Sequence, residues 1–189
     1  MPRMTYDERN NRAINTCNIV AKIAMNQFMY RLSRSGESVL ITEGYRGKDK
    51  QDKEYDEGNS QVIYPFSFHN HGVAIDLVPV LFGQTRIIYN AKKRYERIAK
   101  IANQCGFDWG YNLWGFDKPH FHYTQGNGIG YFISDKELDK KIICDQASAY
   151  YNSELQKIDN GIRHSKGSRK RKLEEEHALV VNLMTDCEY

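Results

Sequence analysis

The sequence predicts an α+β fold, in which a small, mainly antiparallel sheet is flanked by helices and followed by a helical C-terminal extension. Three observations lead to this prediction. Apolar residues recur at three- and four-residue steps over residues 8–33, as on one face of an amphipathic helix. Residues 73–80, VAIDLVPV, form an almost continuous apolar run, which is typical of a buried strand, and the segment that ends at Tyr123 finishes in alternating strand-like residues.

The remaining elements follow in chain order. Residues 39–42 predict a short strand, which glycines at 44 and 47 interrupt before a polar helical turn. A second helix is expected from about residue 90 to 104, because its apolar residues share one face and Gly106 stops it. Beyond about residue 130 the sequence becomes helical and basic, so we expect one domain at 1–130 and an extension at 131–189.

Length and composition limit the class of protein. The 189 residues suit one domain with or without an extension, and no run of 18 apolar residues predicts a membrane span. The opening MPRMTYDERNNR lacks the apolar segment of a signal peptide, so we expect cytoplasmic synthesis. The four cysteines lie far apart without CxxC spacing, which predicts small buried side chains rather than a disulfide framework or a thiolate zinc cluster.

A basic cluster carries much of the net charge of +3. Its members are Arg163, Lys166, Arg169, Lys170, Arg171 and Lys172. A solvated linker or helix face explains such a cluster, and an anionic surface is the alternative target. Nucleic-acid binding is a third hypothesis, which no recognised nucleic-acid motif supports.

Asp76 lies in the middle of the apolar VAIDLVPV run, where an ionised carboxylate needs a cation or a strong hydrogen-bond network. An arginine or a metal ion would serve. His69 with His71, and His120 with His122, form two His-x-His pairs, and in an extended chain such a pair points to one side. Two pairs beside a buried aspartate favour metal binding, with zinc the best match and iron, nickel or copper still open.

Two arrangements fit these residues. One uses all four histidines, as in a dinuclear site, and the other uses three ligands and keeps a position open for water, as catalytic zinc sites usually do. A catalytic site also needs a general base and a group that stabilises the oxyanion. Asp117, which precedes His120 by three residues, is the candidate base, and Arg46 is the candidate for the second role.

Three motifs resemble one peptidase family. The segment SFHNHGVAID, which ends at Asp76, matches the S-x-H-x-x-G-x-A-x-D signature of the D-alanyl-D-alanine carboxypeptidase and L-alanyl-D-glutamate endopeptidase metallopeptidases. The segment DKPHF, which begins at Asp117, matches their D-x-P-H-F signature, and GYRGKDKQ, which ends at Gln51, looks like their arginine-bearing region. The resemblance covers roughly residues 40–123, with the motifs in the family's order.

The resemblance implies that His69, Asp76 and His120 bind one zinc ion, that Asp117 acts as the base, and that Arg46 contacts the substrate carbonyl or oxyanion. It thereby selects the three-ligand arrangement. Six further residues are candidate substrate contacts, with packing or local hydrogen bonding as the alternative role for several of them. They are His71, His122, Trp109, Trp114, Gln51 and Ser67.

The function that the resemblance implies is zinc-dependent cleavage of the stem peptide of bacterial peptidoglycan. We expect an L-alanyl-D-glutamate endopeptidase, with a D-alanyl-D-alanine carboxypeptidase or dipeptidase as the alternative. In lacking a signal peptide, the chain resembles phage endolysins, which reach the cell wall after release from the cytoplasm. Residues 1–130 would be the catalytic domain, and the 163–172 cluster would contact anionic wall polymers, unless the extension simply packs on that domain. A zinc-containing wall-binding module without activity is the alternative from another class.

Overall fold

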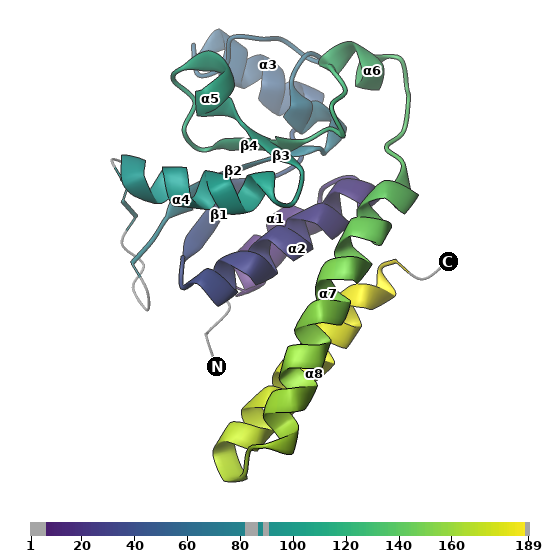
Figure 1. Ribbon diagram of the computed structural model, residues 1–189. Coiled ribbons are helices and arrows are strands. Elements are labelled where there is room, and N and C mark those ends of the chain that lie inside the picture. The colour runs from purple at the N-terminus through teal and green to yellow at the C-terminus, as the bar shows by residue number, and fades with distance from the viewer. Residues whose placement is uncertain (1–6, 82–86, 89–90, 188–189) are drawn as a thin grey trace. The chain divides into compact units, whose positions relative to one another are not determined.

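The computed structural model describes residues 7–81, 87–88 and 91–187, which fall into two compact units that divide between Leu138 and Asp139. Figure 1 shows the helices and strands of both units. In chain order they are α1 (Asp7–Asn15), α2 (Ile19–Ser35), β1 (Val39–Glu43), α3 (Lys48–Asp56), the 3₁₀ turn η1 (Phe68–His71), β2 (Ala74–Pro79), α4 (Lys92–Asn103), β3 (Phe107–Trp109), α5 (Gly110–Trp114), β4 (His120–Tyr123), α6 (Ile129–Ile133), α7 (Lys140–Arg163) and α8 (Gly167–Thr185).

The first unit is built on a four-stranded antiparallel sheet with the strand order β1-β2-β4-β3. Helices α1 and α2 lie on one side of this sheet, and α3 and α5 lie on the other (Figure 1). The predicted α+β fold is confirmed. The strands expected at 39–42 and 73–80 and the helix expected at about 90–104 are present as β1, β2 and α4.

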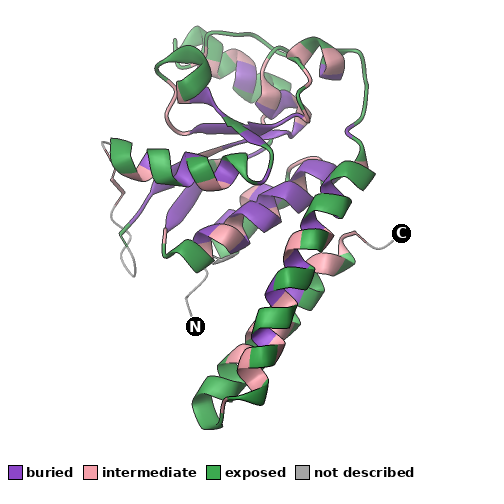
Figure 2. Ribbon diagram, in the orientation of Figure 1, coloured by how far each residue is buried: buried purple, intermediate pink, exposed green. Residues whose placement is uncertain are grey.

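The core of this unit lies on the α2 side of the sheet. Phe121 of β4 packs against Phe28 of α2, with ring centroids 5.9 Å apart, and against Trp109, at 6.2 Å. The Trp109 ring in turn stacks on that of Tyr95 in α4, with ring centroids 6.3 Å apart. All four side chains are buried, as are most residues of the strands (Figure 2). Because side chains alternate along a strand, the histidines on either side of Phe121 point to the opposite face.

The single helix predicted over residues 8–33 is wrong at its middle. The first helix ends at Asn15 and the second begins at Ile19, where the Asn18 side chain accepts two backbone N–H groups of the first turn. The break coincides with a close contact, because the backbone N–H of Asn18 donates to the Gly72 carbonyl at 2.9 Å. A Cβ on Gly72 would lie 2.6 Å from that nitrogen, so this approach requires glycine.

The second unit is a helical hairpin in which α7 and α8 pack side by side (Figure 1). A disulfide joins Cys144, near the start of α7, to Cys187, just after α8. The prediction that the cysteines form no disulfide is therefore wrong for this pair, because the hairpin brings residues 43 positions apart in sequence to a Cα–Cα distance of 5.3 Å. Cys17 and Cys105 are free.

The basic cluster occupies the turn of this hairpin. Arg163 ends α7, Lys166 precedes α8, and the other four residues lie in the first two turns of α8. Across the described residues, no helix combines the length and the apolar character needed to span a membrane.

Candidate metal centre

The turn that carries His69 is held at both ends. Ser67 Oγ accepts the backbone N–H of His69 at 3.3 Å, while the Asn70 side chain accepts the backbone N–H of Ser67 at 3.1 Å, which is a reciprocal capping box. Gly72 ends the turn with φ of 66°. The imidazole Nδ1 of His69 lies 2.7 Å from the Gly44 carbonyl oxygen. A proton on Nδ1 satisfies that carbonyl and leaves the lone pair of Nε2 facing Asp76.

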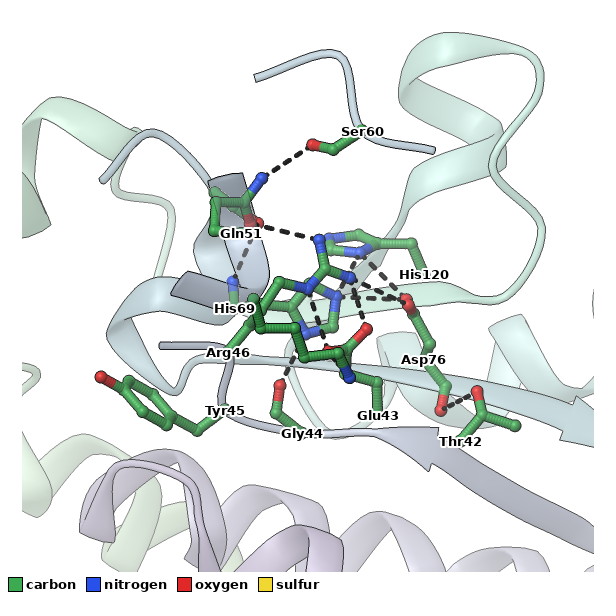
Figure 3. A network of polar contacts seen from close by, with 12 residues as sticks. Thr42, Glu43, Gly44, Tyr45, Arg46, Gln51, Ser60, His69, Asp76 and His120 are labelled. Carbon is green, nitrogen blue, oxygen red and sulfur yellow. Dashed lines mark hydrogen bonds and ion pairs between the residues drawn. The ribbon is translucent and has the colours of Figure 1, made fainter. Parts of the chain in front are cut away.

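Asp76 and His120 face each other across the two central strands, because β2 and β4 pair with Asp76 opposite His120. Their side chains therefore lie on the same face of the sheet, where His69 joins them (Figure 3). Asp76 Oδ1 lies 3.2 Å from His69 Nε2 and 3.3 Å from His120 Nδ1, and the two nitrogens are 3.1 Å apart. The three atoms form a nearly equilateral triangle.

This triangle fits a tetrahedral divalent cation. Bonds of about 2.0–2.1 Å in tetrahedral geometry separate two ligand atoms by about 3.3–3.4 Å, close to each side of the triangle. Two imidazoles and one carboxylate are a donor set that zinc accepts readily. Among the described residues, this is the group of His, Cys, Asp and Glu side chains that could hold a metal ion. We therefore call His69, Asp76 and His120 the triad.

The charges of the triad favour an ionised aspartate. Burial by itself would raise the pKa of Asp76, but the charges and hydrogen bonds of His69 and His120 hold that pKa far below its ordinary value. Burial by itself would lower the pKa of His69, yet the neighbouring Asp76 carboxylate raises it. The carboxylate that the sequence places in an apolar strand thus has cationic or metal-binding partners on its own face of the sheet.

Arg46 lies at the edge of the triad and is held by Glu43 (Figure 3). Its Nε donates to Glu43 Oε1 at 3.0 Å, its Nη2 donates to Glu43 Oε2, and its Nη1 donates to Gln51 Oε1 at 3.2 Å. Nη2 also lies 3.9 Å from Asp76 Oδ2. The predicted arginine is therefore beside the metal-site aspartate, with its guanidinium plane fixed by a two-pronged contact.

Gln51 supports this arrangement by accepting a hydrogen bond from Arg46. Its side chain is fully buried, and its Oε1 also accepts the amide of Asn70 at 3.3 Å. Its Nε2 donates to Ser60 Oγ at 2.8 Å and to the Val62 carbonyl at 2.6 Å. Because protein groups use both ends of the amide, Gln51 is placed to orient Arg46.

Asp117 lies in the loop that leads into β4. Burial raises the pKa of its carboxyl, while the charge of His120 opposes this shift and the charge of Asp76 adds to it. The charges of the triad therefore act on the Asp117 carboxyl. The loop passes very close to Gly110, where an added Cβ would lie 3.0 Å from the Asp117 carbonyl oxygen.

Residues 63–123 match the family described as D-alanyl-D-alanine carboxypeptidase, and this segment contains the triad and Asp117. This segment of the chain is therefore similar to that peptidase family. One relative is the peptidoglycan L-alanyl-D-glutamate endopeptidase CwlK of Bacillus subtilis (strain 168), which is 33% identical over 47% of this chain and 62% of its own length. The match thus spans less than two thirds of that relative.

Among solved structures, the L-Ala D-Glu endopeptidase ChiX of Serratia marcescens is similar to this chain with a TM-score of 0.52 and 21% sequence identity. The match covers 61% of this chain and 86% of that chain. This likeness shows that the two proteins share a fold.

The other two histidines of the His-x-His pairs, His71 and His122, lie outside the triad. His71 Nε2 lies 2.8 Å from the Pro65 carbonyl oxygen, so that its ring supports the loop before η1. His122 is buried and stacks on Phe68, with ring centroids 4.3 Å apart. Burial, followed by the charge of His120, lowers the pKa of His122 to about 3.

The two tryptophans occupy different places. Trp114 is 43% exposed, and its ring centroid lies 5.2 Å from that of His120 and 5.9 Å from that of His122. Trp109 lies on the core face, and its Nε1 donates to the Lys118 carbonyl at 2.7 Å. Trp114 is therefore at the exposed edge of the site, whereas Trp109 holds the loop before β4.

Three groups that position the site were not predicted from the sequence. Glu43 binds Arg46, the Gly44 carbonyl orients His69, and Asn70 joins the turn to the backbone carbonyl of Arg46 at 2.8 Å. An acidic residue that ends a strand three positions before the arginine was an available signal for Glu43. No sequence signal identifies a backbone carbonyl such as that of Gly44.

Proposed function

We propose that this protein is a zinc-dependent L-alanyl-D-glutamate endopeptidase that cleaves the stem peptide of bacterial peptidoglycan. The observation that carries the proposal is the triad, whose three ligand atoms lie 3.1–3.3 Å apart. The choice of bond is supported by CwlK and ChiX, whose names both give this activity. A D-alanyl-D-alanine carboxypeptidase is the second candidate, because the matched family carries that description.

The residues of the chain have distinct roles in this reaction. When bound to the triad, zinc supplies a Lewis acid that polarises the scissile carbonyl and lowers the pKa of water to about 7. Asp117 takes a proton from the attacking water and returns it to the leaving amine. Because burial raises the pKa of Asp117, its carboxylate is a stronger base than that of an exposed aspartate.

Arg46 stabilises the negative charge that develops on the carbonyl oxygen. Preorganised donors aimed at this charge contribute about 10²–10³ in kcat in comparable sites. The contacts of Arg46 with Glu43 and Gln51 keep its guanidinium in place before the substrate arrives.

A digestion experiment tests the activity and the choice of bond together. Purified peptidoglycan is incubated with the zinc-loaded protein, and the new termini are identified by mass spectrometry. New L-alanine carboxyl termini and D-glutamate amino termini are expected, whereas release of D-alanine alone would assign the carboxypeptidase activity instead. The Asp117→Asn variant should retain zinc and lose cleavage, and normal turnover by that variant would exclude Asp117 as the base.

We also propose that the peptidase acts in phage-type lysis, reaching the wall after release from the cytoplasm, and that its basic cluster contacts anionic wall polymers. Residues 163–172 contain six basic residues and no acidic residue, which supports an anionic partner. Reversing two charges in the full-length chain, Arg169→Glu with Lys172→Glu, should weaken co-sedimentation with purified wall at low salt. Unchanged sedimentation would remove the cluster from the proposal.

A further inference from the structure

We infer that Glu43 is a positioning residue of this site, which fixes the guanidinium of Arg46 between its own carboxylate and the carboxylate of Asp76. The inference rests on the proposed function, in which Arg46 stabilises the developing oxyanion. Glu43 itself lies outside the three motifs that were recognised in the sequence.

A register shift in the sheet brings Glu43 to this place. Strands β1 and β2 pair regularly as far as Ile41, which lies opposite Leu77, but the next pair joins Glu43 to Asp76. Without the shift, Thr42 would lie opposite Asp76. The irregularity therefore puts a carboxylate, instead of a hydroxyl, across from the metal-site aspartate, and bulges commonly re-aim side chains beside active sites.

Two carboxylates opposite each other repel unless a cation separates them. Arg46 is that cation, because Nη2 contacts Glu43 Oε2 and lies 3.9 Å from Asp76 Oδ2. The side chains of Glu43 and Arg46 are 12% and 11% exposed, so the pair is largely shielded from water. Burial alone would raise the pKa of Glu43, but its hydrogen bonds with Arg46 and Lys50 keep that pKa below its ordinary value.

The contact with Glu43 also decides which donors remain for the reaction. A guanidinium has five N–H donors in a fixed plane. Glu43 accepts two of them, on Nε and Nη2, and Gln51 accepts one on Nη1. One donor on each terminal nitrogen has no hydrogen-bond partner among the described residues. Glu43 therefore holds Arg46 by one edge and leaves the other edge available to Asp76 and to the substrate.

Glu37 provides a matched control within the same chain. Like Glu43, it is a carboxylate of low exposure, 10%, that pairs with two cations, Arg94 at 2.9 Å and Arg97 at 2.7 Å. It precedes β1, whereas Glu43 ends that strand beside the triad. Glu37→Gln and Glu43→Gln thus remove similar ion pairs, but only the second touches Arg46.

The test measures kcat and KM for a stem peptide with the zinc-loaded single variants Glu43→Gln, Glu37→Gln and Arg46→Ala and with the double variant of Glu43→Gln and Arg46→Ala. Glu43→Gln should lower kcat by about 10- to 100-fold, as loss of a supporting contact commonly does, and should change KM much less. Glu37→Gln should leave kcat unchanged. The double variant should be no slower than Arg46→Ala alone, because Glu43 acts through Arg46.

Two kinetic results would overturn the inference: a Glu43→Gln variant with wild-type kcat, or losses from Glu43→Gln and Arg46→Ala that multiply. If Glu43→Gln does not fold, Glu43→Asp keeps the charge but is one methylene shorter, and it should fold and still lose kcat.

The Arg46 Nε–H signal in NMR gives a readout that is independent of catalysis. This proton should exchange with solvent slowly in the wild type and in Glu37→Gln and rapidly in Glu43→Gln. If the wild type cleaves no stem peptide, the proposed function fails, while slow exchange in Glu43→Gln would refute the positioning itself.

Discussion

Replacing Gly110 with alanine should damage both the stability and the proposed activity of this protein. An added Cβ would lie 2.9 Å from Cζ3 of Trp114, 3.0 Å from the Asp117 carbonyl oxygen and 3.0 Å from Cβ of His120. The Trp114 ring is exposed and can move, but the other two atoms belong to the backbone or lie next to it. Relief of these contacts therefore has to shift the loop that carries the proposed base and one triad ligand.

The structure sets the size of both effects. Overpacking of this kind costs about 1–3 kcal/mol, which in a unit of this size lowers Tm by roughly 3–12 °C. A displacement of Asp117 and His120 by several tenths of an ångström should also lower kcat by roughly 10- to 100-fold. Thermal unfolding, zinc content and cleavage of a stem peptide would be measured on the same preparations.

Gly128→Ala is the matched control. Gly128 has φ of −78°, and an added Cβ there meets no atom within 4 Å, so its Tm should change by an amount equivalent to less than about 1 kcal/mol and its kcat should not change. A Gly110→Ala variant with wild-type Tm and kcat would show that the loop does not need this close approach.

Three further predictions follow from the site and the hairpin. Because Asp117 must be ionised to accept a proton and its pKa is raised, kcat/KM should rise with pH through a limb above the ordinary value of 3.8, and a limb at or below that value would contradict the assignment. Removal of zinc by a chelator should lower Tm, since an ion at 100 times its Kd stabilises the folded state by about 2.7 kcal/mol; an unchanged Tm would argue against a bound ion. Cys144→Ser should weaken the hairpin by roughly 2–4 kcal/mol in urea unfolding, while Cys17→Ser should not, and equal stability of the two variants would mean that the disulfide is not formed.

Much of this arrangement could be predicted from the sequence, because the strongest signals are local. The apolar run around Asp76 predicted β2, and the spacing of apolar residues predicted α4. A charged side chain in an apolar strand and two histidine pairs indicated a metal site, and the family resemblance then selected the three triad residues. The structure brings these three side chains together.

The features that the sequence did not predict depend on contacts between distant segments. The break before Asn18 exists because Gly72 packs there, and apolar periodicity alone continues through it. The Cys144–Cys187 pair depends on how α7 returns as α8, which residue spacing does not reveal. The role of Glu43 depends on a register shift of one residue, which pattern analysis cannot distinguish from regular pairing.

The direct pairing of Asp76 with His120 makes the metal site dependent on the register of β2 and β4. A slip of one residue between the two middle strands would send one of these side chains to the far side, because neighbouring positions alternate. A grafting experiment would therefore need few parts. One antiparallel ribbon with a facing aspartate and histidine, preceded by a single capped turn seven residues before the aspartate, contains every ligand that this cation site requires.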